Sequence, residues 1–268
     1  MATSAELIGG TELPRHEAER LLVAATNRSR IDLHFAGDLG PDEVDRYRAL
    51  VDRRRAGEPL QYLEGDTPFG PATINVDPRV LIPRPETEEM LELVADLAPH
   101  PRTIVDLCTG SGNLAVALAM INPGTRVLAS DISPDAIEVA RANAARNEVG
   151  VELLVGDLFE PLPLELRAGV DLLVANPPYL AEHELAHLPG DVVREPVGAL
   201  VGGPRGDEVV ARIGAAAVDW LVPGGVVVCE ISEFDAERSV GHFDSLDGVV
   251  HRDLSGKDRF VVGRRRFE

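Results

Sequence analysis

The stretch Ile104-Val105-Asp106-Leu107-Cys108-Thr109-Gly110-Ser111-Gly112-Asn113 decides the fold of this chain. An apolar run leads into two closely spaced glycines, and a stretch with helical character follows from 112 to 121. Glycines at such a point let the backbone turn tightly and approach a ligand closely, while the first turn of the helix leaves N–H groups free. The stretch therefore predicts a buried strand that passes through a ligand-binding turn into a helix.

Strands and helices alternate regularly after residue 100. Apolar runs predict strands at 103–107, 126–130, 151–155, 170–175, 225–231, 249–251 and 259–263. Helical spacing predicts helices at 112–121, 134–147, 207–221 and 235–243. This alternation implies a parallel sheet with helices on both faces. Only a short polar loop joins the last two strands, so we expect them to be antiparallel.

The N-terminal part of the chain has a different pattern. Apolar residues recur at helical spacing in 14–26 and 41–55. From about 66 to 85, prolines and glycines separate short apolar pieces, which indicates a hairpin or an extended linker. We therefore expect a helical domain at 1–65, a hairpin or linker at 66–85 and an α/β domain at 86–268.

Composition and charge narrow the classes of function. Hydrophobic residues make up 44% of the 268 residues, and the formal net charge is −19, from 26 basic and 45 acidic residues. A protein that holds duplex DNA normally needs a basic face, so this charge argues against direct nucleic-acid binding. The chain shows no run of about 18 apolar residues and no signal-peptide pattern, so we expect a cytoplasmic protein without a membrane partner. We also expect a monomer.

Acidic residues close the first three of these strands. Asp106 can accept a hydrogen bond from a cationic amino group, Asp131 from both hydroxyls of a ribose, and Asp157 from an adenine amino group. The spacing Gly110-x-Gly112-x-x-Ala115 also fits a dinucleotide site, so NAD stays open beside S-adenosylmethionine. The acid directly before the loop and the third acidic strand end favour S-adenosylmethionine. The neighbouring residues that complete the predicted cofactor site are Thr109, Gly110, Gly112, Ile132 and Leu158.

The strand at 170–175 leads into Asn176-Pro177-Pro178-Tyr179. An amide nitrogen is a poor nucleophile because its lone pair is delocalised into the carbonyl group. The Asn176 side-chain oxygen and the Pro177 carbonyl can localise that lone pair on the nitrogen by accepting hydrogen bonds from the two N–H groups of the amide. The prolines fix the backbone that carries these acceptors, and Tyr179 can stack on a planar group. Beside a glycine loop, at the edge where open α/β sheets bind ligands, the tetrapeptide predicts methyl transfer to a planar amide rather than a rigid turn alone.

A second motif invites a different interpretation. His183-Glu184-Leu185-Ala186-His187 matches the H-E-x-x-H pattern of zinc peptidases. No third ligand follows at a typical spacing, and the segment directly follows Tyr179, where a loop over the site is expected. We therefore expect solvated polar residues and no metal site.

Together these residues resemble the protein-(glutamine-N5) methyltransferases that modify peptide chain release factors, the HemK/PrmC family. The likeness runs over nearly the full length, and its most specific part joins Leu81-Ile82-Pro83-Arg84-Pro85-Glu86-Thr87-Glu88 to Asn176-Pro177-Pro178-Tyr179. It also covers the stretches at 54–65 and 253–259.

The resemblance implies an α/β fold of the Rossmann-like class I methyltransferase type, with a seven-stranded sheet whose last strand is antiparallel and a small N-terminal helical domain that helps hold the release factor. It implies substrate binding for the domain at 1–65 and methyl transfer for the domain at 86–268. It implies methyl transfer from S-adenosylmethionine, which leaves S-adenosylhomocysteine, to the glutamine of a Gly-Gly-Gln motif. The implied catalytic residues are Asn176, Pro177 and Tyr179. The implied substrate-binding residues add Pro178, Arg84 and Thr87, and Asn176 is also expected to touch the cofactor.

Three places depart from the family pattern: Arg194, Gly206-Asp207-Glu208 and Ser232-Glu233-Phe234-Asp235. They lie outside the methyl-transfer motif, but they leave open that the methyl group goes to an acceptor other than glutamine. One is a small molecule, and another is the N6 amino group of adenine, which the acidic charge and an aromatic content of 4% disfavour. A binding protein without catalysis is a third alternative, against which the intact Asn176 and strand-end acids argue.

Overall fold

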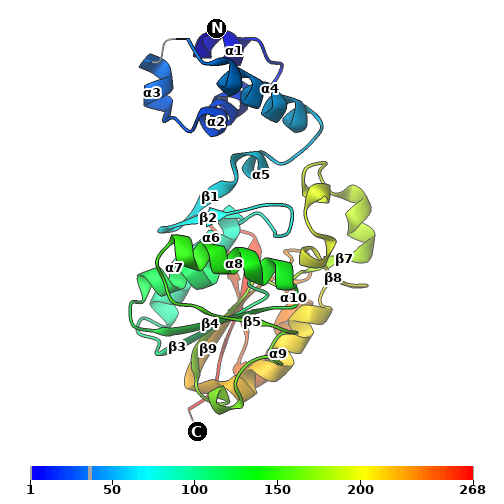
Figure 1. The fold of residues 1–268 in the computed structure, drawn as a ribbon. Helices are drawn as coiled ribbons and strands as arrows, with labels where there is room; N and C mark the ends of the chain where they lie inside the picture. Colours follow the sequence, from blue (N-terminus) through cyan, green and yellow to red (C-terminus); the bar gives the residue numbers. More distant parts are fainter. Residues whose placement is uncertain (1, 36–37, 268) are drawn as a thin grey trace. The chain divides into compact units, whose positions relative to one another are not determined.

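The computed structural model describes residues 2–35 and 38–267 (Figure 1). Contacts divide the chain into two compact units. The first contains the residues up to Thr67 together with Pro189–Arg194, and the second contains Pro68–Leu188 and Glu195 onward. The sequence does not predict that the short segment at 189–194 belongs with the N-terminal helices.

The first unit is helical, as predicted. Its helices are α1 (Ser4–Gly9), α2 (Arg15–Thr26), α3 (Arg30–Phe35), α4 (Pro41–Arg55) and α5 (Leu60–Glu64). Helix α4 begins where proline stands in the first turn and the Gly40 N–H donates to the Glu43 carboxylate at 2.9 Å. Leu21, Leu22 and Tyr47 lie almost fully buried between α2 and α4 and form the centre of this unit's core.

A hairpin and a helix precede the large sheet. Strands β1 (Asp66–Phe69) and β2 (Ala72–Asn75) form a two-stranded sheet, so the hairpin is the alternative that the structure shows. The buried Asn143 side chain holds β2 in place: it accepts from the Asn75 N–H at 2.7 Å and donates to the Asn75 carbonyl at 3.0 Å. Helix α6 (Pro85–Leu97) follows.

The second unit is built on a seven-stranded sheet in the order β10-β11-β9-β6-β3-β4-β5. Its strands are β3 (Thr103–Leu107), β4 (Arg126–Asp131), β5 (Glu152–Val155), β6 (Val170–Ala175), β9 (Leu221–Glu230), β10 (Val249–Arg252) and β11 (Asp258–Arg264). Strands β3, β4, β5, β6 and β9 pair in parallel, and β11 is antiparallel to both of its neighbours. The predicted seven-stranded class I architecture is confirmed.

Helices cover both faces of this sheet (Figure 1). They are α7 (Asn113–Ile121), α8 (Pro134–Arg146), α9 (Glu208–Trp220) and α10 (Ala236–Gly241). Successive residues of a strand face opposite sides, so Val105 and Leu107 pack with the Ile213 and Trp220 side of α9, whereas Asp106 between them points to the α7 side. This alternation places one charged side chain in an otherwise apolar strand.

Because the parallel strands share one direction, their carboxyl ends meet at one edge of the sheet. Two small elements that the sequence does not predict lie close to the residues that follow β6. Strands β7 (Leu180–Ala181) and β8 (Val201–Gly203) pair in parallel, and between them Glu182–His187 forms a 3-10 helix. The pairing of β7 with β8 returns the chain that follows Asn176 to the carboxyl edge of the large sheet.

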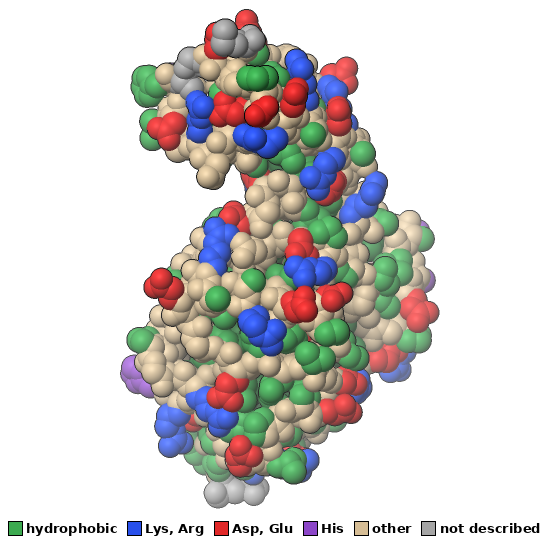
Figure 2. Space-filling view, viewed as in Figure 1, with side chains coloured by type: hydrophobic (Ala, Val, Ile, Leu, Met, Phe, Trp, Pro, Cys, Tyr) green, Lys and Arg blue, Asp and Glu red, His purple; other side chains and the backbone are tan. Residues whose placement is uncertain are grey.

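The surface is charged without being uniformly acidic. On the face drawn in Figure 2, Lys and Arg side chains lie among Asp and Glu side chains and form no continuous basic patch. None of the helices in the described part of the chain combines the length and the apolar composition needed to cross a bilayer.

Candidate active site

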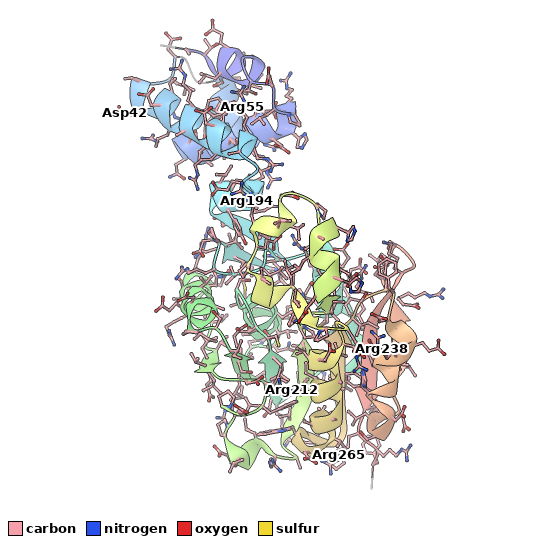
Figure 3. All side chains as sticks on the ribbon, turned by 90° about the vertical axis from the view of Figure 1, so that its right-hand side faces the viewer. Asp42, Arg55, Arg194, Arg212, Arg238 and Arg265 are labelled. Carbon is pink, nitrogen blue, oxygen red and sulfur yellow. The ribbon has the colours of Figure 1, made fainter. Side chains whose placement is uncertain are left out.

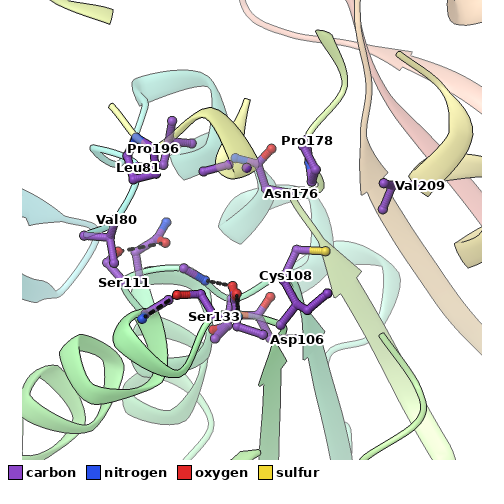
Figure 4. Close-up of a pocket in the computed structure, with 18 of the residues that line it drawn as sticks. Val80, Leu81, Asp106, Cys108, Ser111, Ser133, Asn176, Pro178, Pro196 and Val209 are labelled. Carbon is purple, nitrogen blue, oxygen red and sulfur yellow. Dashed lines mark hydrogen bonds between the residues drawn. The ribbon is translucent and has the colours of Figure 1, made fainter. Parts of the chain in front are cut away.

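A cavity of about 500 Å³ lies at the carboxyl edge of the sheet (Figure 4). In this view Asn176 and Pro178 lie toward the top, and Asp106 and Ser133 lie toward the bottom. The structure brings together on its wall most of the residues that the sequence proposes for the cofactor. These are Asp106, Thr109, Gly110, Asp131, Ile132, Asp157, Leu158 and Asn176.

The glycine loop shapes one side of the cavity. Gly110 lines it with a φ of 54°, in the left-handed region that favours glycine. Gly112 does not line it: a Cβ atom at Gly112 would lie 2.9 Å from the Cβ of Ala140, so this glycine lets the loop pack against α8. The two glycines therefore serve different purposes, one beside the ligand space and one behind it.

Asp106 is fully buried, and only one of its two carboxylate oxygens has hydrogen-bond partners in the described residues. Its Oδ2 accepts from the Thr109 hydroxyl at 2.6 Å and from the Ala115 N–H at 3.2 Å. Its Oδ1 is buried and has no hydrogen-bond partner among the described residues. Burial raises the pKa of this carboxyl to about 7, although its hydrogen bonds lower it. A buried oxygen without a partner on the wall of a cavity is expected to meet a hydrogen-bond donor of the ligand.

Asp131 closes the next strand and also lines the cavity. Its two oxygens each accept one backbone N–H, from Ser133 at 2.9 Å and from Gly110 at 2.8 Å. A carboxylate has about four acceptor sites, so two remain for a diol. Burial raises the pKa of Asp131, and these backbone bonds oppose the shift.

Asp157 lies on the cavity wall in an ion pair. Arg212, which Figure 3 shows on α9, contacts the Asp157 carboxylate at 2.7 Å. Both residues line the cavity, and the sequence gives no sign of the pairing because they are 55 positions apart. The ion pair fixes the Asp157 carboxylate at the edge of the ligand space.

The tetrapeptide after β6 occupies the opposite wall. Asn176 and Pro178 line the cavity, while Pro177 is buried. Two glycines pack tightly beneath this turn: a Cβ at Gly202 would lie 2.4 Å from the Pro178 carbonyl oxygen, and one at Gly206 would lie 2.6 Å from the Tyr179 carbonyl oxygen. Gly206, one of the departures from the family pattern, has a φ of 93° and so takes part in holding the motif.

Besides Pro177, three residues proposed for substrate binding lie outside the cavity wall. Thr87 is fully buried, and its hydroxyl accepts from the Asn176 side-chain nitrogen at 3.0 Å. Tyr179 donates to the Glu230 carboxylate at 3.1 Å. Arg84 forms an ion pair with the buried Glu195. Each is occupied within the protein, and none is among the residues that face the ligand space.

Sequence reasoning missed the apolar wall of the site. Glu195 accepts the Ile82 N–H at 3.0 Å as well as the Arg84 guanidinium, and so holds the loop at 80–83 beside the cavity. The apolar residues that line the cavity from this loop and from the later segments are Val80, Leu81, Pro83, Pro196, Ala199, Val201 and Val209.

The segment that matches the zinc-peptidase pattern does not form a metal site in the described residues. It is a 3-10 helix, and no group of three or more His, Cys, Asp or Glu side chains in the described ranges is placed to hold a metal ion. The Ala181 N–H donates to the Glu184 carboxylate at 2.7 Å, so this acid caps the segment.

Two family models match the chain. The PrmC N-terminal domain matches residues 3–65, and the methyltransferase small domain matches residues 87–203. The two matches fall on the N-terminal helices and on the part of the sheet that carries Asp106, Asp131, Asp157 and Asn176.

Curated relatives and solved structures agree with these models. The chain is 42% identical to the release factor glutamine methyltransferase of Mycolicibacterium smegmatis, over 98% of this chain and 95% of the relative. It is 41% identical to the protein of the same name from Moorella thermoacetica, over 97% and 94%. The structure of a methyltransferase from Pyrococcus furiosus has a TM-score of 0.54 and 18% identity, covering 73% of this chain and 90% of that one, which shows a shared fold.

Proposed function

Because the chain belongs to the release factor glutamine methyltransferases, we propose that it transfers a methyl group from S-adenosylmethionine to the side-chain amide nitrogen of a glutamine in a peptide chain release factor. The target glutamine is that of the Gly-Gly-Gln motif, and the reaction takes place in the cytoplasm, where translation terminates. In this proposal the release factor is held by the N-terminal helical unit, which matches the PrmC N-terminal domain at residues 3–65.

One observation carries the proposal: a single cavity has the Asp106 carboxylate in its wall and Asn176 in the opposite wall (Figure 4). The unpartnered Asp106 Oδ1 fits the ammonium group of S-adenosylmethionine, and Asp131 has acceptor sites for the ribose hydroxyls. Asp157 and the apolar Leu158 and Val209 suit an adenine ring. When bound, the cofactor supplies an electrophilic methyl group on its sulfonium.

The acidic lining also discriminates between the two cofactors that the glycine loop admits. S-adenosylmethionine carries positive charge, whereas the pyrophosphate of NAD is an anion. The Asp106 and Asp131 carboxylates beside Gly110 would repel an anion at this loop and attract a cation. The charge beside the glycine loop therefore supports S-adenosylmethionine, while the cationic Arg79 and Arg212 line other parts of the cavity.

On the acceptor side, the protein supplies two oxygens and a rigid frame. A primary amide has two N–H donors, and the Asn176 Oδ1 and the Pro177 carbonyl are the two acceptors assigned to them. Pro177 and Pro178 cannot donate and have a fixed φ, and Gly202 lets another backbone segment press against the Pro178 carbonyl. Pre-positioned acceptors of this kind lower the barrier because little reorganisation is needed during the reaction.

The test uses methyl-labelled S-adenosylmethionine with a purified release factor, beside the same factor with its Gly-Gly-Gln glutamine changed to alanine. We expect label on the first and none on the second. The Asn176→Ala variant, with cofactor binding checked by calorimetry, serves as the catalytic control. Equal labelling of both factors would contradict the Gly-Gly-Gln glutamine as the acceptor. No label on either factor while the cofactor binds would contradict the release factor as the substrate and favour a small molecule or adenine.

A further inference from the structure

A second buried acid lies behind the acceptor site and takes no part in lining the cavity. Glu230 ends β9 and is 1% exposed. Its Oε2 accepts from the Thr87 hydroxyl at 2.7 Å, and its Oε1 accepts from the Tyr179 hydroxyl at 3.1 Å. The Thr87 hydroxyl in turn accepts from the Asn176 Nδ2 at 3.0 Å. The four side chains form one connected chain of hydrogen bonds.

The direction of this chain follows from the number of protons available. A hydroxyl has a single proton to donate, and that of Thr87 is committed to the Glu230 carboxylate. The oxygen of Thr87 can then only accept from its other neighbour, so Asn176 must present its NH₂ group to Thr87. The carbonyl oxygen of the Asn176 amide is thereby turned to the other side of the side chain.

This orientation matters for the acceptor substrate. The nitrogen of a glutamine amide offers only N–H donors, so the residue beside it must present an oxygen. If the Asn176 amide were rotated by 180°, an NH₂ group would face the substrate NH₂ group, and neither could accept. The two orientations of an isolated asparagine differ little in energy, so a fixed neighbour is needed to select one.

We propose that Glu230, acting through Thr87, is a positioning residue that sets the orientation of the Asn176 amide for a substrate that donates N–H groups. The inference rests on the proposed function, which supplies such a substrate. Glu230 also accepts a hydrogen bond from the Tyr179 hydroxyl. One carboxylate therefore holds the side chains at both ends of the motif, Tyr179 directly and Asn176 through Thr87.

The hydrogen bonds at Glu230 and the charge of Arg259 favour the ionised form, which only accepts hydrogen bonds, whereas burial opposes it. Burial raises its pKa to about 7, while the Thr87 and Tyr179 bonds and the charge of Arg259 lower it. Arg259 is itself held by Asp253 at 3.1 Å. The other titratable groups that act on this site are Glu86, which raises the pKa of Glu230, and the buried neighbour Cys229, whose own pKa is raised by burial.

Thr87 offers a matched pair of substitutions. Thr87→Ser keeps the hydroxyl, whereas Thr87→Val keeps the shape and removes it. With S-adenosylmethionine saturating, we expect Thr87→Val to lower kcat about 10- to 100-fold and Thr87→Ser to stay within about threefold of the wild type. The dissociation constant for the cofactor should be unchanged in both. Thr125→Val, which removes a hydroxyl bonded to the Pro101 carbonyl near the start of β4, is the control and should leave kcat unchanged.

Glu230→Met tests the source of the orientation, since it replaces the carboxylate by an apolar side chain of similar length. We expect a loss of kcat like that of Thr87→Val, and no further loss when the two changes are combined, because they interrupt one chain of hydrogen bonds. Full kcat in Thr87→Val, an equal loss in Thr87→Ser, or multiplicative losses in the double variant would overturn the proposal.

A second measurement does not depend on any acceptor. The Asn176 side-chain amide protons, assigned by their disappearance in Asn176→Ala, are followed by NMR hydrogen exchange without release factor. We expect one proton to be protected in the wild type and in Thr87→Ser, and unprotected in Thr87→Val and Glu230→Met. Protection that survives in Thr87→Val would overturn the positioning role. Protection as expected in a protein that fails to label the release factor would instead contradict the proposed function alone.

Discussion

Cofactor binding should weaken as the pH falls below 7, because Asp106 must be ionised to receive an ammonium group. Burial raises the pKa of this carboxyl to about 7 in the ligand-free protein, and the Oδ1 that faces no partner would accept from the ligand. Binding therefore selects the carboxylate form and releases a proton from any molecule that still carries one.

The size of the effect follows from this pKa. If only the ionised form binds, the dissociation constant is proportional to the factor (1 + 10^(pKa − pH)). With a pKa of about 7, this factor is about 2 at pH 7 and about 11 at pH 6. Affinity should fall about fivefold between these two pH values, which corresponds to about 1 kcal/mol. At pH 7, about half a proton should be released for each ligand bound.

Titration calorimetry with S-adenosylhomocysteine measures both quantities. The ligand has the same amino-acid end, and its α-amino group stays charged between pH 6 and pH 7. Repeating the titration in two buffers of different ionisation enthalpy gives the number of protons released. An affinity that is equal at pH 6 and pH 7, with no proton released, would refute the assignment of Asp106 to the ammonium group.

Three further outcomes are expected. Asn176→Ala should lower the rate of methyl transfer at least about 100-fold and leave the cofactor dissociation constant within about twofold; a large loss of cofactor binding would contradict its role. Asp131→Ala should weaken cofactor binding about 10- to 100-fold by calorimetry, because it removes a charged acceptor, and an unchanged constant would exclude that contact. Asp253, whose pKa is lowered to about 2 mainly by the Ser255 hydroxyl, should contribute about 2 kcal/mol to the free energy of unfolding above pH 4. That contribution is lost as the pH falls from about 4 to about 2, and denaturant melts of Asp253→Asn should lack this loss.

Much of the large sheet could be predicted from the sequence because its central strands are buried on both faces. Such strands appear as mainly apolar runs, and that at 170–175 has the predicted bounds. Strand β9 begins at Leu221 rather than at 225, because Leu221 pairs with Val170 across a shift in register that no local pattern reveals. Strands β7 and β8 have only two and three residues, too few for a periodicity to appear.

The acids on the cavity wall could be proposed because each follows a recognisable strand at the edge where parallel strands end. The partners of these and other site residues could not. Thr87 and Glu230 are 143 positions apart, and Arg84 and Glu195 are 111 apart. Their pairing depends on how α6 and the later segments pack on the sheet, which the order of residues along the chain does not encode locally.

Asp106 near the end of β3 and Glu230 at the end of β9 are both buried acids, and the structure gives them different partners. Burial raises the pKa of each to about 7, so charge alone does not distinguish them. Their hydrogen bonds do: both oxygens of Glu230 are occupied by side chains, whereas one oxygen of Asp106 has no partner in the described part of the chain. A buried carboxylate whose two oxygens both bind side chains of the protein is suited to positioning those neighbours, whereas one with an unpartnered oxygen on a cavity wall is suited to accepting from a ligand. In these two proposals, a buried carboxylate binds the methyl donor at one strand end and another orders the acceptor site at the other.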